Sequence, residues 1–344
     1  MLNVLRLGFL LALLGLALPT QAEQLTIVSL NFAMSTSGHR RERLEAFART
    51  IEERKPDVVA LQEFYFSVAD LPVVTQLRKL LGAHYDLHLG IPPSGKFENT
   101  KLPFRPLASG LAWLVRKDVT IESRHAEKWR QNFLIDLFTQ KGFFHLAIKK
   151  DQGRRIHVIN AHLNPFFPGK NLADLLKKYL QGVKQAPKDL GLDEIIKRTQ
   201  IDQVAAYIKA LPQGEPVFLM GDLNIISTRE YPDHPFLSLP QHNLYAYLVK
   251  ALDMSDTWAT VHESPEDKGF TYDPAHNPLA IPVPDQFKLM FPMPFRGSYL
   301  FAKLAGTGVD SAAMELLFDQ PIKLKANKTT FLSDHYGLLA SFSY

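Results

Sequence analysis

Five apolar segments of the chain each adjoin one or two polar residues that could bind a metal ion or a phosphate group. The apolar stretches have the composition of buried strands, so we expect the polar residues at strand ends. They are Asn31, Glu63, His162, Asp222 followed by Asn224, and the pair Asp334-His335. A core does not need an amide, carboxylates and imidazoles at strand ends, whereas a hydrolytic site does. The pattern therefore predicts a hydrolytic site.

Each of these residues also has an ordinary structural interpretation. Asn31 could be a turn or cap residue, Glu63 a surface charge, and His162 a core histidine with satisfied hydrogen bonds. Asp222 could form an Asx turn, and the Asp334-His335 pair could cap a strand. The occurrence of all five at strand ends favours function. An amide with a carboxylate also suits Mg²⁺, which binds few protein oxygens and keeps positions for water and phosphate.

The first 22 residues have the pattern of an export signal. Arg6 precedes an apolar stretch from Gly8 to Leu18, and small residues follow up to Ala22. This stretch is too short to span a membrane, so we predict a signal peptide at 1–22, cleaved after Ala22. An uncleaved anchor is the alternative. The prediction implies a periplasmic or secreted protein.

Composition excludes some kinds of site and leaves others open. The 344 residues are 46% hydrophobic, which is sufficient for a large core, and they contain no cysteine. Disulfides, thiolate metal ligands and thiolate nucleophiles are therefore excluded. Lys and Arg number 39 against 35 Asp and Glu, and removal of Arg6 with the signal leaves a net charge of +3. This charge is too small to indicate nucleic-acid binding by itself.

The chain contains a long internal echo. The strand before Asn31 is followed by a helical pattern at Leu44, Phe47, Ala48 and Ile51, by Pro56, and by the strand before Glu63. The strand before His162 is followed by the same order, with helical stretches, a proline and the strand before Asp222. Apolar spacing marks two helical stretches in this half: Leu172, Leu175, Leu176 and Tyr179, and then Ile201, Val204, Ala205, Ile208 and Leu211. Apolar spacings of three and four residues predict helices with one buried face. Two such halves could pack face to face with their polar ends at one rim; two unrelated units are the alternative.

Residues 109–115 and 142–148 are predicted as two further strands, because they are rich in β-branched and aromatic residues between polar turns. From Pro278 to Phe301 the chain is crowded with prolines and aromatics, which predicts long ordered loops.

The five polar sites lie in segments that resemble the ordered motifs of the endonuclease/exonuclease/phosphatase superfamily, which has the DNase-I-like fold. The segments are Ser29-Leu30-Asn31, Leu61-Gln62-Glu63, Asn160-Ala161-His162-Leu163, Gly221-Asp222-Leu223-Asn224 and Ser333-Asp334-His335. The resemblance spans essentially all of residues 23–344 and implies a single catalytic domain. Its expected fold is α/β (α+β): a four-layer DNase-I-like sandwich of two packed mixed β-sheets flanked by helices.

The resemblance also implies a role for each residue. Glu63 would bind an essential Mg²⁺, for which Mn²⁺ or Co²⁺ could substitute, with Asn31 assisting at the metal or phosphate. His335 would be the general base, oriented by Asp334. The remaining positions are Asp222 and Asn224, which would position nucleophile and phosphate, and His162, which would stabilise charge on the phosphoryl group. Asp222 as a ligand of a second metal is an open alternative.

Two further segments are similar to neutral sphingomyelinases. Asp136 to Gly142 resembles their Asp-x₄-Lys-Gly segment, and Thr271 to Asn277 resembles their Thr-x-Asp-x₃-Asn segment. The resemblance implies that Asp136, Lys141 and Asn277 contact substrate or gate the site, with Asp136 and Lys141 forming an ion pair or hydrogen bond near its mouth. Two solvated loop charges of little energetic value are the alternative for that pair.

The proline-rich segment offers a candidate membrane contact. Its prolines prevent a continuous helix or central strand, and aromatic side chains beside cations suit a bilayer interface. We therefore expect Phe291 and Phe295 to contact a membrane. The alternative is a loop that covers the core. The stretch from Asp319 to Leu332, where secreted bacterial sphingomyelinases carry an aromatic hairpin, is short and rich in lysine here.

Together these observations predict an exported Mg²⁺-dependent phosphodiesterase of the phospholipase C type. It would hydrolyse sphingomyelin or a related phospholipid to ceramide or diacylglycerol and a phosphorylated headgroup. We expect a monomer that meets a phospholipid or sphingolipid at a membrane surface, with no obligate nucleic acid and no protein partner. The alternatives are a secreted DNase-I-like nuclease and a catalytically silent surface-binding protein on the same fold.

Overall fold

The structure is a computed structural model of the 344-residue chain. It describes the residues 24–33, 38–64, 71–92, 108–132, 139–150, 153–165, 192–232, 243–264, 266–280, 294–304, 306–325 and 328–343. The predicted signal peptide, Asp136, Phe291 and the helical pattern from Leu172 to Tyr179 lie outside these residues.

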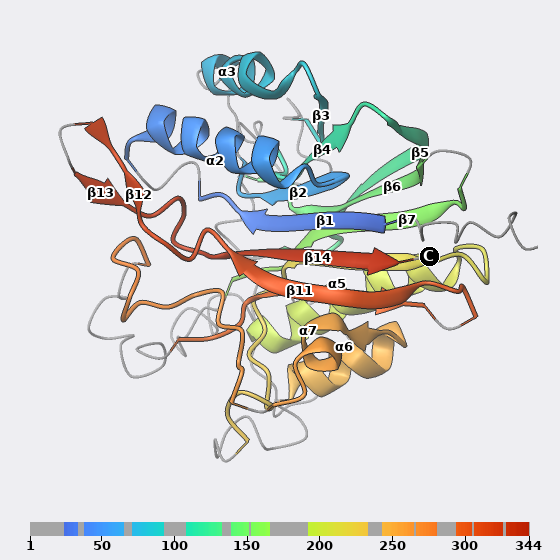
Figure 1. Ribbon diagram of the computed structural model, residues 1–344. Coiled ribbons are helices and arrows are strands. Elements are labelled where there is room, and N and C mark those ends of the chain that lie inside the picture. The colour runs from blue at the N-terminus through green and yellow to red at the C-terminus, as the bar shows by residue number, and fades with distance from the viewer. Residues whose placement is uncertain are drawn as a thin grey trace, which may run out of the picture.

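Two six-stranded sheets pack face to face, and helices cover both outer faces (Figure 1). The first sheet has the order β11 (Asp310–Leu317), β14 (Gly337–Ser343), β1 (Gln24–Asn31), β2 (Val58–Gln62), β4 (Ala112–Arg116), β3 (Tyr85–Leu89). The second has the order β5 (Val119–Lys128), β6 (Gly142–Lys150), β7 (Ile156–His162), β8 (Val217–Asp222), β10 (Ser298–Lys303), β9 (Ser255–Asp256). A small hairpin of β12 (Ile322–Lys323) and β13 (Thr329–Thr330) extends from the first sheet.

Three apolar layers hold this arrangement together. The inner layer lies between the sheets and includes Leu25 and Ile27 of β1 together with Phe218 and Met220 of β8. The next residues of β1, Val28 and Leu30, belong to a second layer with the helices α2 (Arg40–Arg54) and α3 (Leu71–Leu81). A third layer joins the second sheet to α5 (Leu192–Lys209) and α6 (Leu244–Leu252), while the short helix α7 (Thr257–Val261) contacts β10 and β11. The four-layer sandwich is confirmed.

The two predicted halves are also confirmed. β1 pairs in parallel with β2 through the crossover helix α2, and β7 pairs in parallel with β8 through α5. Every other strand pair among the described residues is antiparallel, so both sheets are mixed. Parallel neighbours end at the same edge of a sheet. All four strands therefore bring their carboxyl ends to one rim.

Helix α2 shows how the sequence sets one of these crossovers. The buried Leu44, Phe47 and Ile51 form one face of the helix. The helix ends where Lys55 adopts a left-handed conformation and its N–H donates to the Ile51 carbonyl. Pro56 cannot continue the helix hydrogen-bonding, so the chain turns directly into β2.

The strands predicted at residues 109–115 and 142–148 correspond to β4 and β6. Asp310 opens β11 opposite Ser343, at the end of the sheet away from the rim. Within the described residues, no helix is both long and apolar enough to cross a membrane.

Candidate active site

Strand alternation brings three of the predicted residues to the rim. Side chains of a strand alternate between faces, so Asn31 shares a face with Ile27, which lies between the sheets. By the same count His162 follows Val158 of β7, and Asp222 follows Met220 of β8. These three side chains extend the facing inner rows of the two sheets, and all are at most 1% exposed.

Glu63 reaches the same rim by a different route. An extended backbone would point it toward the helix side, because Val59 and Leu61 lie in the layer beneath α2 and α3. Glu63 instead has φ = 50°, in the left-handed region that non-glycine residues rarely adopt. This turn directs its carboxylate to the rim, where Oε1 accepts a hydrogen bond from Asn31.

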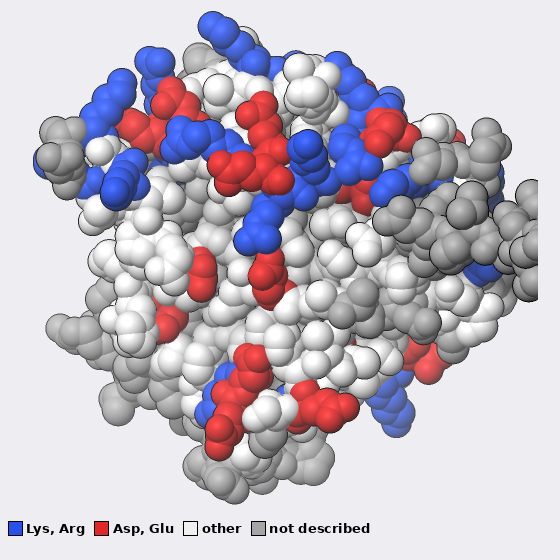
Figure 2. Space-filling model, viewed as in Figure 1, with Lys and Arg blue, Asp and Glu red and all other residues white. Residues whose placement is uncertain are grey.

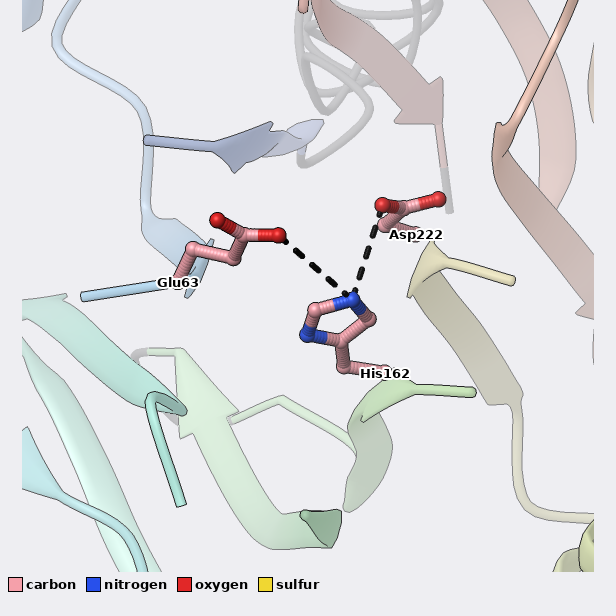
Figure 3. A group of neighbouring side chains, drawn as sticks. All are labelled: Glu63, His162 and Asp222. Atoms are coloured by element: carbon pink, nitrogen blue, oxygen red, sulfur yellow. Dashed lines mark ion pairs between the residues drawn. The ribbon is translucent and has the colours of Figure 1, made fainter. Parts of the chain in front are cut away.

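The Asn31 amide joins the two halves of the site. Its Nδ2 donates to Glu63 Oε1 at 3.2 Å and to Asp222 Oδ2 at 2.9 Å. The imidazole of His162 lies between the same two carboxylates, with Nε2 3.9 Å from Glu63 Oε1 and 3.6 Å from Asp222 Oδ2 (Figure 3). The structure therefore brings four of the predicted residues together.

The two carboxylates differ in their electrostatics. Burial raises the pKa of Glu63, and the nearby negative charge of Asp334 raises it further. Burial also disfavours ionisation of Asp222, but the imidazoles of His335 and His162 and the Asn31 hydrogen bond outweigh it, so the pKa of Asp222 is lowered overall.

The surroundings of His162 disfavour its charged form. Burial lowers its pKa well below the ordinary value, and the positive charge of Lys141 lowers it further. Lys141 Nζ lies 3.3 Å from His162 Nε2, and the lysine is only 3% exposed. Lys141 is thus part of the site itself. Its predicted partner Asp136 lies outside the described residues, so that pairing stays a prediction.

The loop from Ser333 to Tyr336 supplies His335. The Ser333 hydroxyl donates to the Asn31 carbonyl at 2.6 Å and accepts the His335 N–H at 3.2 Å, so this loop is fastened to the end of β1. His335 Nε2 lies 3.9 Å from Asp222 Oδ2. Asp334 lies 3.2 Å from the Ser333 hydroxyl, and its predicted orientation of His335 stays a prediction.

Asn224 and Gly221 shape the chain around Asp222. Asn224 has φ = 50°, and its N–H donates to Asp222 Oδ1 at 3.1 Å. Its side-chain amide donates to the carbonyl of Leu163, the residue after His162. At Gly221 a Cβ would lie 1.8 Å from the Ala161 carbonyl oxygen, so only glycine allows β8 this close to β7. Asn224 thus positions Asp222 and His162.

This geometry agrees with the family to which the sequence is assigned. The family model of the endonuclease/exonuclease/phosphatase family matches residues 28–235, which is more than half of the chain. The chain belongs to this family. No curated protein sequence matches it significantly.

Solved structures share the fold of this family member at low sequence identity. Sphingomyelinase C from Streptomyces griseocarneus has a TM-score of 0.62 and 18% identity, over 93% of this chain and 99% of that one. TDP2 from D. rerio, complexed with a single-strand DNA product, has a TM-score of 0.61 and 18% identity, over 94% and 100%. A mutant beta toxin from Staphylococcus aureus with bound magnesium ions has a TM-score of 0.59 and 19% identity, over 92% and 99%.

The donor set of this family member fits a divalent cation. Glu63, His162 and Asp222 offer ligand atoms that all lie within 4.8 Å of one another. The carboxylates of Glu63 and Asp222 meet at this place, and each accepts a hydrogen bond from the Asn31 amide. Carboxylate and amide oxygens suit Mg²⁺, and an imidazole nitrogen also suits Mn²⁺ or Co²⁺.

Sequence reasoning did not identify the buried amide pair beneath the rim. Gln62 Nε2 of β2 donates to Asn160 Oδ1 of β7 at 2.8 Å, and Asn160 Nδ2 donates to the Leu61 carbonyl at 2.9 Å. Gln62 directly precedes Glu63, and Asn160 lies two residues before His162, in the motifs that contain these two site residues. This bridge between the sheets fixes the separation of those two side chains.

Arg43 was also not identified. It is completely buried within α2, where its guanidinium donates to the Phe32 and Leu332 carbonyls. These carbonyls belong to the segments that follow Asn31 and precede Ser333. Burial lowers the pKa of Arg43 to about 10, so it remains charged. A charged residue on an otherwise apolar helix face was the available signal.

Two of the remaining predicted residues are buried. Asn277 is 0% exposed, and its side chain donates to the Ser333 carbonyl rather than facing solvent. Phe295 is 6% exposed, and its ring packs 5.1 Å from that of Tyr272. Burial of Phe295 favours the alternative, a loop that covers the core, and corrects its assignment as an exposed membrane contact. Phe291 lies outside the described residues.

Proposed function

We propose that this protein is an exported, Mg²⁺-dependent phosphodiesterase of the phospholipase C type. It hydrolyses sphingomyelin or a related phospholipid to ceramide or diacylglycerol and a phosphorylated headgroup. The observation that supports hydrolysis most directly is the convergence of Glu63, Asn31, His162, Asp222 and His335 at one rim. The similarity of two segments to neutral sphingomyelinases supports the lipid substrate.

The arrangement of His335 and Asp222 suits activation of water. Their facing atoms are 3.9 Å apart, so one water molecule at an ordinary hydrogen-bond distance could contact both. His335 Nε2 takes one proton from this water while Asp222 Oδ2 accepts its other hydrogen bond. The water oxygen bonds to phosphorus, the bond from phosphorus to the lipid oxygen breaks, and the lipid oxygen gains a proton from solvent.

The other residues handle the negative charge of the phosphate. Glu63 and Asn31 would hold the cation, which when bound neutralises charge on the phosphoryl oxygens. His162 stabilises charge on the phosphoryl group from this rim, and Lys141, with Nζ 3.3 Å from His162 Nε2, adds a positive charge. The lowered pKa of His162 suits a site that holds a cation, because an uncharged imidazole does not repel it.

Hydrolysis of DNA is the second candidate function, and the fold similarity to TDP2 favours it. Charge is the main argument against it. On the face in Figure 2, basic side chains over α2 are interspersed with acidic ones, as in the pairs Arg41–Glu45 and Arg54–Glu315, and the middle is largely uncharged. Nucleic-acid binding depends on clustered basic residues.

One assay separates these candidates. Purified protein with Mg²⁺ or EDTA is offered sphingomyelin, phosphatidylcholine, plasmid DNA and single-stranded DNA in parallel, with a His335→Ala preparation as the control for contaminants. Hydrolysis of a phospholipid that EDTA abolishes is the expected result. Cleavage of DNA alone would establish the second candidate, and no hydrolysis would favour the surface-binding protein. Export is tested separately by sequencing the secreted N-terminus, expected at Glu23.

A further inference from the structure

The segment from Thr271 to Asn277 connects the strand β10, which lies beside Asp222, to the loop that carries His335. Thr271 is 0% exposed, and its Oγ1 accepts the N–H groups of Gly297 and Ser298, each at 3.0 Å. Its carbonyl accepts the N–H of Tyr336 at 2.7 Å. Thr271 therefore fastens the beginning of β10 to the residue after His335.

Asn277 fastens the other end of the same loop. Its Nδ2 donates to the Ser333 carbonyl at 2.8 Å, and its Oδ1 accepts the Leu279 N–H at 3.0 Å. The loop that carries His335 is therefore bound at Ser333 and at Tyr336 by residues of one segment. Between them, Tyr272 forms a bridge to His335, with ring centroids 5.1 Å apart.

The strand fastened by Thr271 is the neighbour of the other half of the catalytic pair. In the register of β10 with β8, Ser298 is directly opposite Asp222. The Gly297 carbonyl also accepts the N–H groups of Leu223 and Asn224. The position of Thr271 therefore controls Asp222 on one side and His335 on the other.

The described residues make no side-chain hydrogen bond to the His335 ring. Its Nδ1 is buried and has no hydrogen-bond partner among the described residues. The nearest carboxylate atom, Asp222 Oδ2, is 3.9 Å from Nε2, which is beyond hydrogen-bond distance. The placement of this imidazole therefore depends on the backbone of its loop and on the Tyr272 ring.

We propose that Thr271 and Asn277 are positioning residues, which together set the distance between His335 and Asp222. This rests on the proposed hydrolytic role of His335, but not on the identity of the substrate. Both side chains are fully buried and their polar atoms already have backbone partners, so they do not contact substrate. The motif shared with sphingomyelinases thus acts through the base and its water.

The test compares Thr271→Val with Thr271→Ser. Valine keeps the shape but removes the acceptor of two N–H groups, whereas serine keeps the acceptor. Hydrolysis of bis(4-nitrophenyl) phosphate is measured with saturating Mg²⁺. Valine should lower kcat about 10- to 100-fold, the loss expected when reacting groups move by about 1 Å, with KM and the Mg²⁺ half-saturation unchanged. Serine should restore most of kcat.

Thr307→Val is the matched control. Thr307 is also buried, and its hydroxyl donates to the Leu304 carbonyl and accepts the Val309 N–H. It lies between β10 and β11, at the ends of these strands away from the rim. If Thr307→Val loses stability like Thr271→Val but keeps kcat, the effect at Thr271 is not general loosening. Equal loss of kcat in both variants would overturn the proposal.

Crystal structures give a readout that does not depend on activity. The distance from His335 Nε2 to Asp222 Oδ2 should increase in Thr271→Val and stay near 3.9 Å in Thr271→Ser. An unchanged distance in the valine variant would overturn the proposal, even if the wild type hydrolysed nothing and the proposed function itself failed. If Thr271→Val does not fold, Asn277→Ala, which frees the Ser333 carbonyl and the Leu279 N–H, is examined in the same way.

Discussion

The two β-α-β units of the molecule have the same topology but supply the site with different chemistry. β1, α2 and β2 end in Asn31 and Glu63, whereas β7, α5 and β8 end in His162 and Asp222. The first unit contributes an amide and a carboxylate whose side chain is 25% exposed. The second contributes an imidazole and a carboxylate that are almost completely buried.

The carboxylates at these equivalent places have opposite pKa shifts. The pKa of Glu63 is raised, first by burial and then by Asp334, while that of Asp222 is lowered because two imidazoles and an amide outweigh its burial. Environment rather than topology therefore divides their roles. Asp222 is a stable anion for the imidazoles, and Glu63 gains most from a bound cation.

The largest effect on turnover is expected from removal of His335, the proposed base, whose imidazole faces Asp222 of the second unit. His335→Ala should lower kcat about 100- to 10,000-fold, the range that general-base catalysis contributes. Steady-state kinetics on a small phosphodiester measures it. His276→Ala is the control, because His276 is 79% exposed and paired with Asp273. A His335→Ala rate close to that of the wild type would remove His335 from the mechanism.

A second experiment separates the two carboxylates. Glu63→Gln should raise the Mg²⁺ concentration for half-maximal rate by at least about 10-fold, the lower end of the loss at metal-site partners. Asp222→Asn should instead lower the rate even at saturating Mg²⁺, because His162 and His335 no longer have a carboxylate beside them. Metal titrations of both variants test this. Identical titration curves would contradict the division of roles.

Lys141 distinguishes gating from direct participation. Its contact with His162 predicts that Lys141→Met lowers turnover of lipid and of a small phosphodiester equally, by about 10-fold if it supplies one charged contact of about 1.4 kcal/mol. The gating hypothesis predicts a much larger loss on lipid. Parallel assays on both substrates decide between them, with Lys149→Met, in the strand β6 that begins directly after Lys141, as the control.

The smallest effects concern stability, and they should have opposite signs. In metal-free protein at neutral pH, Glu63→Gln should raise Tm. The pKa of Glu63 is raised in the folded protein, so its contribution to stability is fully present only at a pH below the ordinary pKa of a glutamate and is lost as the pH rises through the raised pKa. Asp222→Asn should lower Tm. The pKa of Asp222 is lowered in the folded protein, so its contribution to stability is present at a pH above the ordinary pKa of an aspartate and is lost as the pH falls through the lowered pKa.

Each pKa unit corresponds to about 1.4 kcal/mol, and each kcal/mol to a Tm change of roughly 2–4 °C. Thermal denaturation in EDTA between pH 3 and pH 8, the range over which carboxylates titrate, measures both variants. Saturating Mg²⁺ should cancel the advantage of Glu63→Gln. Tm changes of the same sign in both variants at neutral pH would contradict the opposite shifts.

The regular part of the fold could be predicted because burial leaves a clear pattern in the sequence. The strands β1, β2, β7 and β8 are largely apolar and almost entirely buried, and α2 and α5 have apolar spacings of three and four residues. The edge strand β5 was missed, because most of its side chains are exposed and it has no such run.

The types of the site residues could be predicted, but their contacts could not. Alternation alone would place Glu63 on the helix side of its strand, and only its left-handed backbone brings it to the rim. The contact of Lys141 with His162 crosses neighbouring strands. The approach of Asp222 to His335 depends on how two distant segments of the chain pack. Such contacts follow from the assembled fold rather than from local sequence.

The pairing of β1 with β14 has a practical consequence. Gln24 lies opposite Ser343, so the two ends of the described chain are side by side at the end of the sandwich opposite the rim. Attachment to a surface through Gln24 or Ser343 would therefore leave the rim facing outward. A short peptide could join the two ends, so that new termini could be opened in an exposed loop without cutting any strand that carries the site.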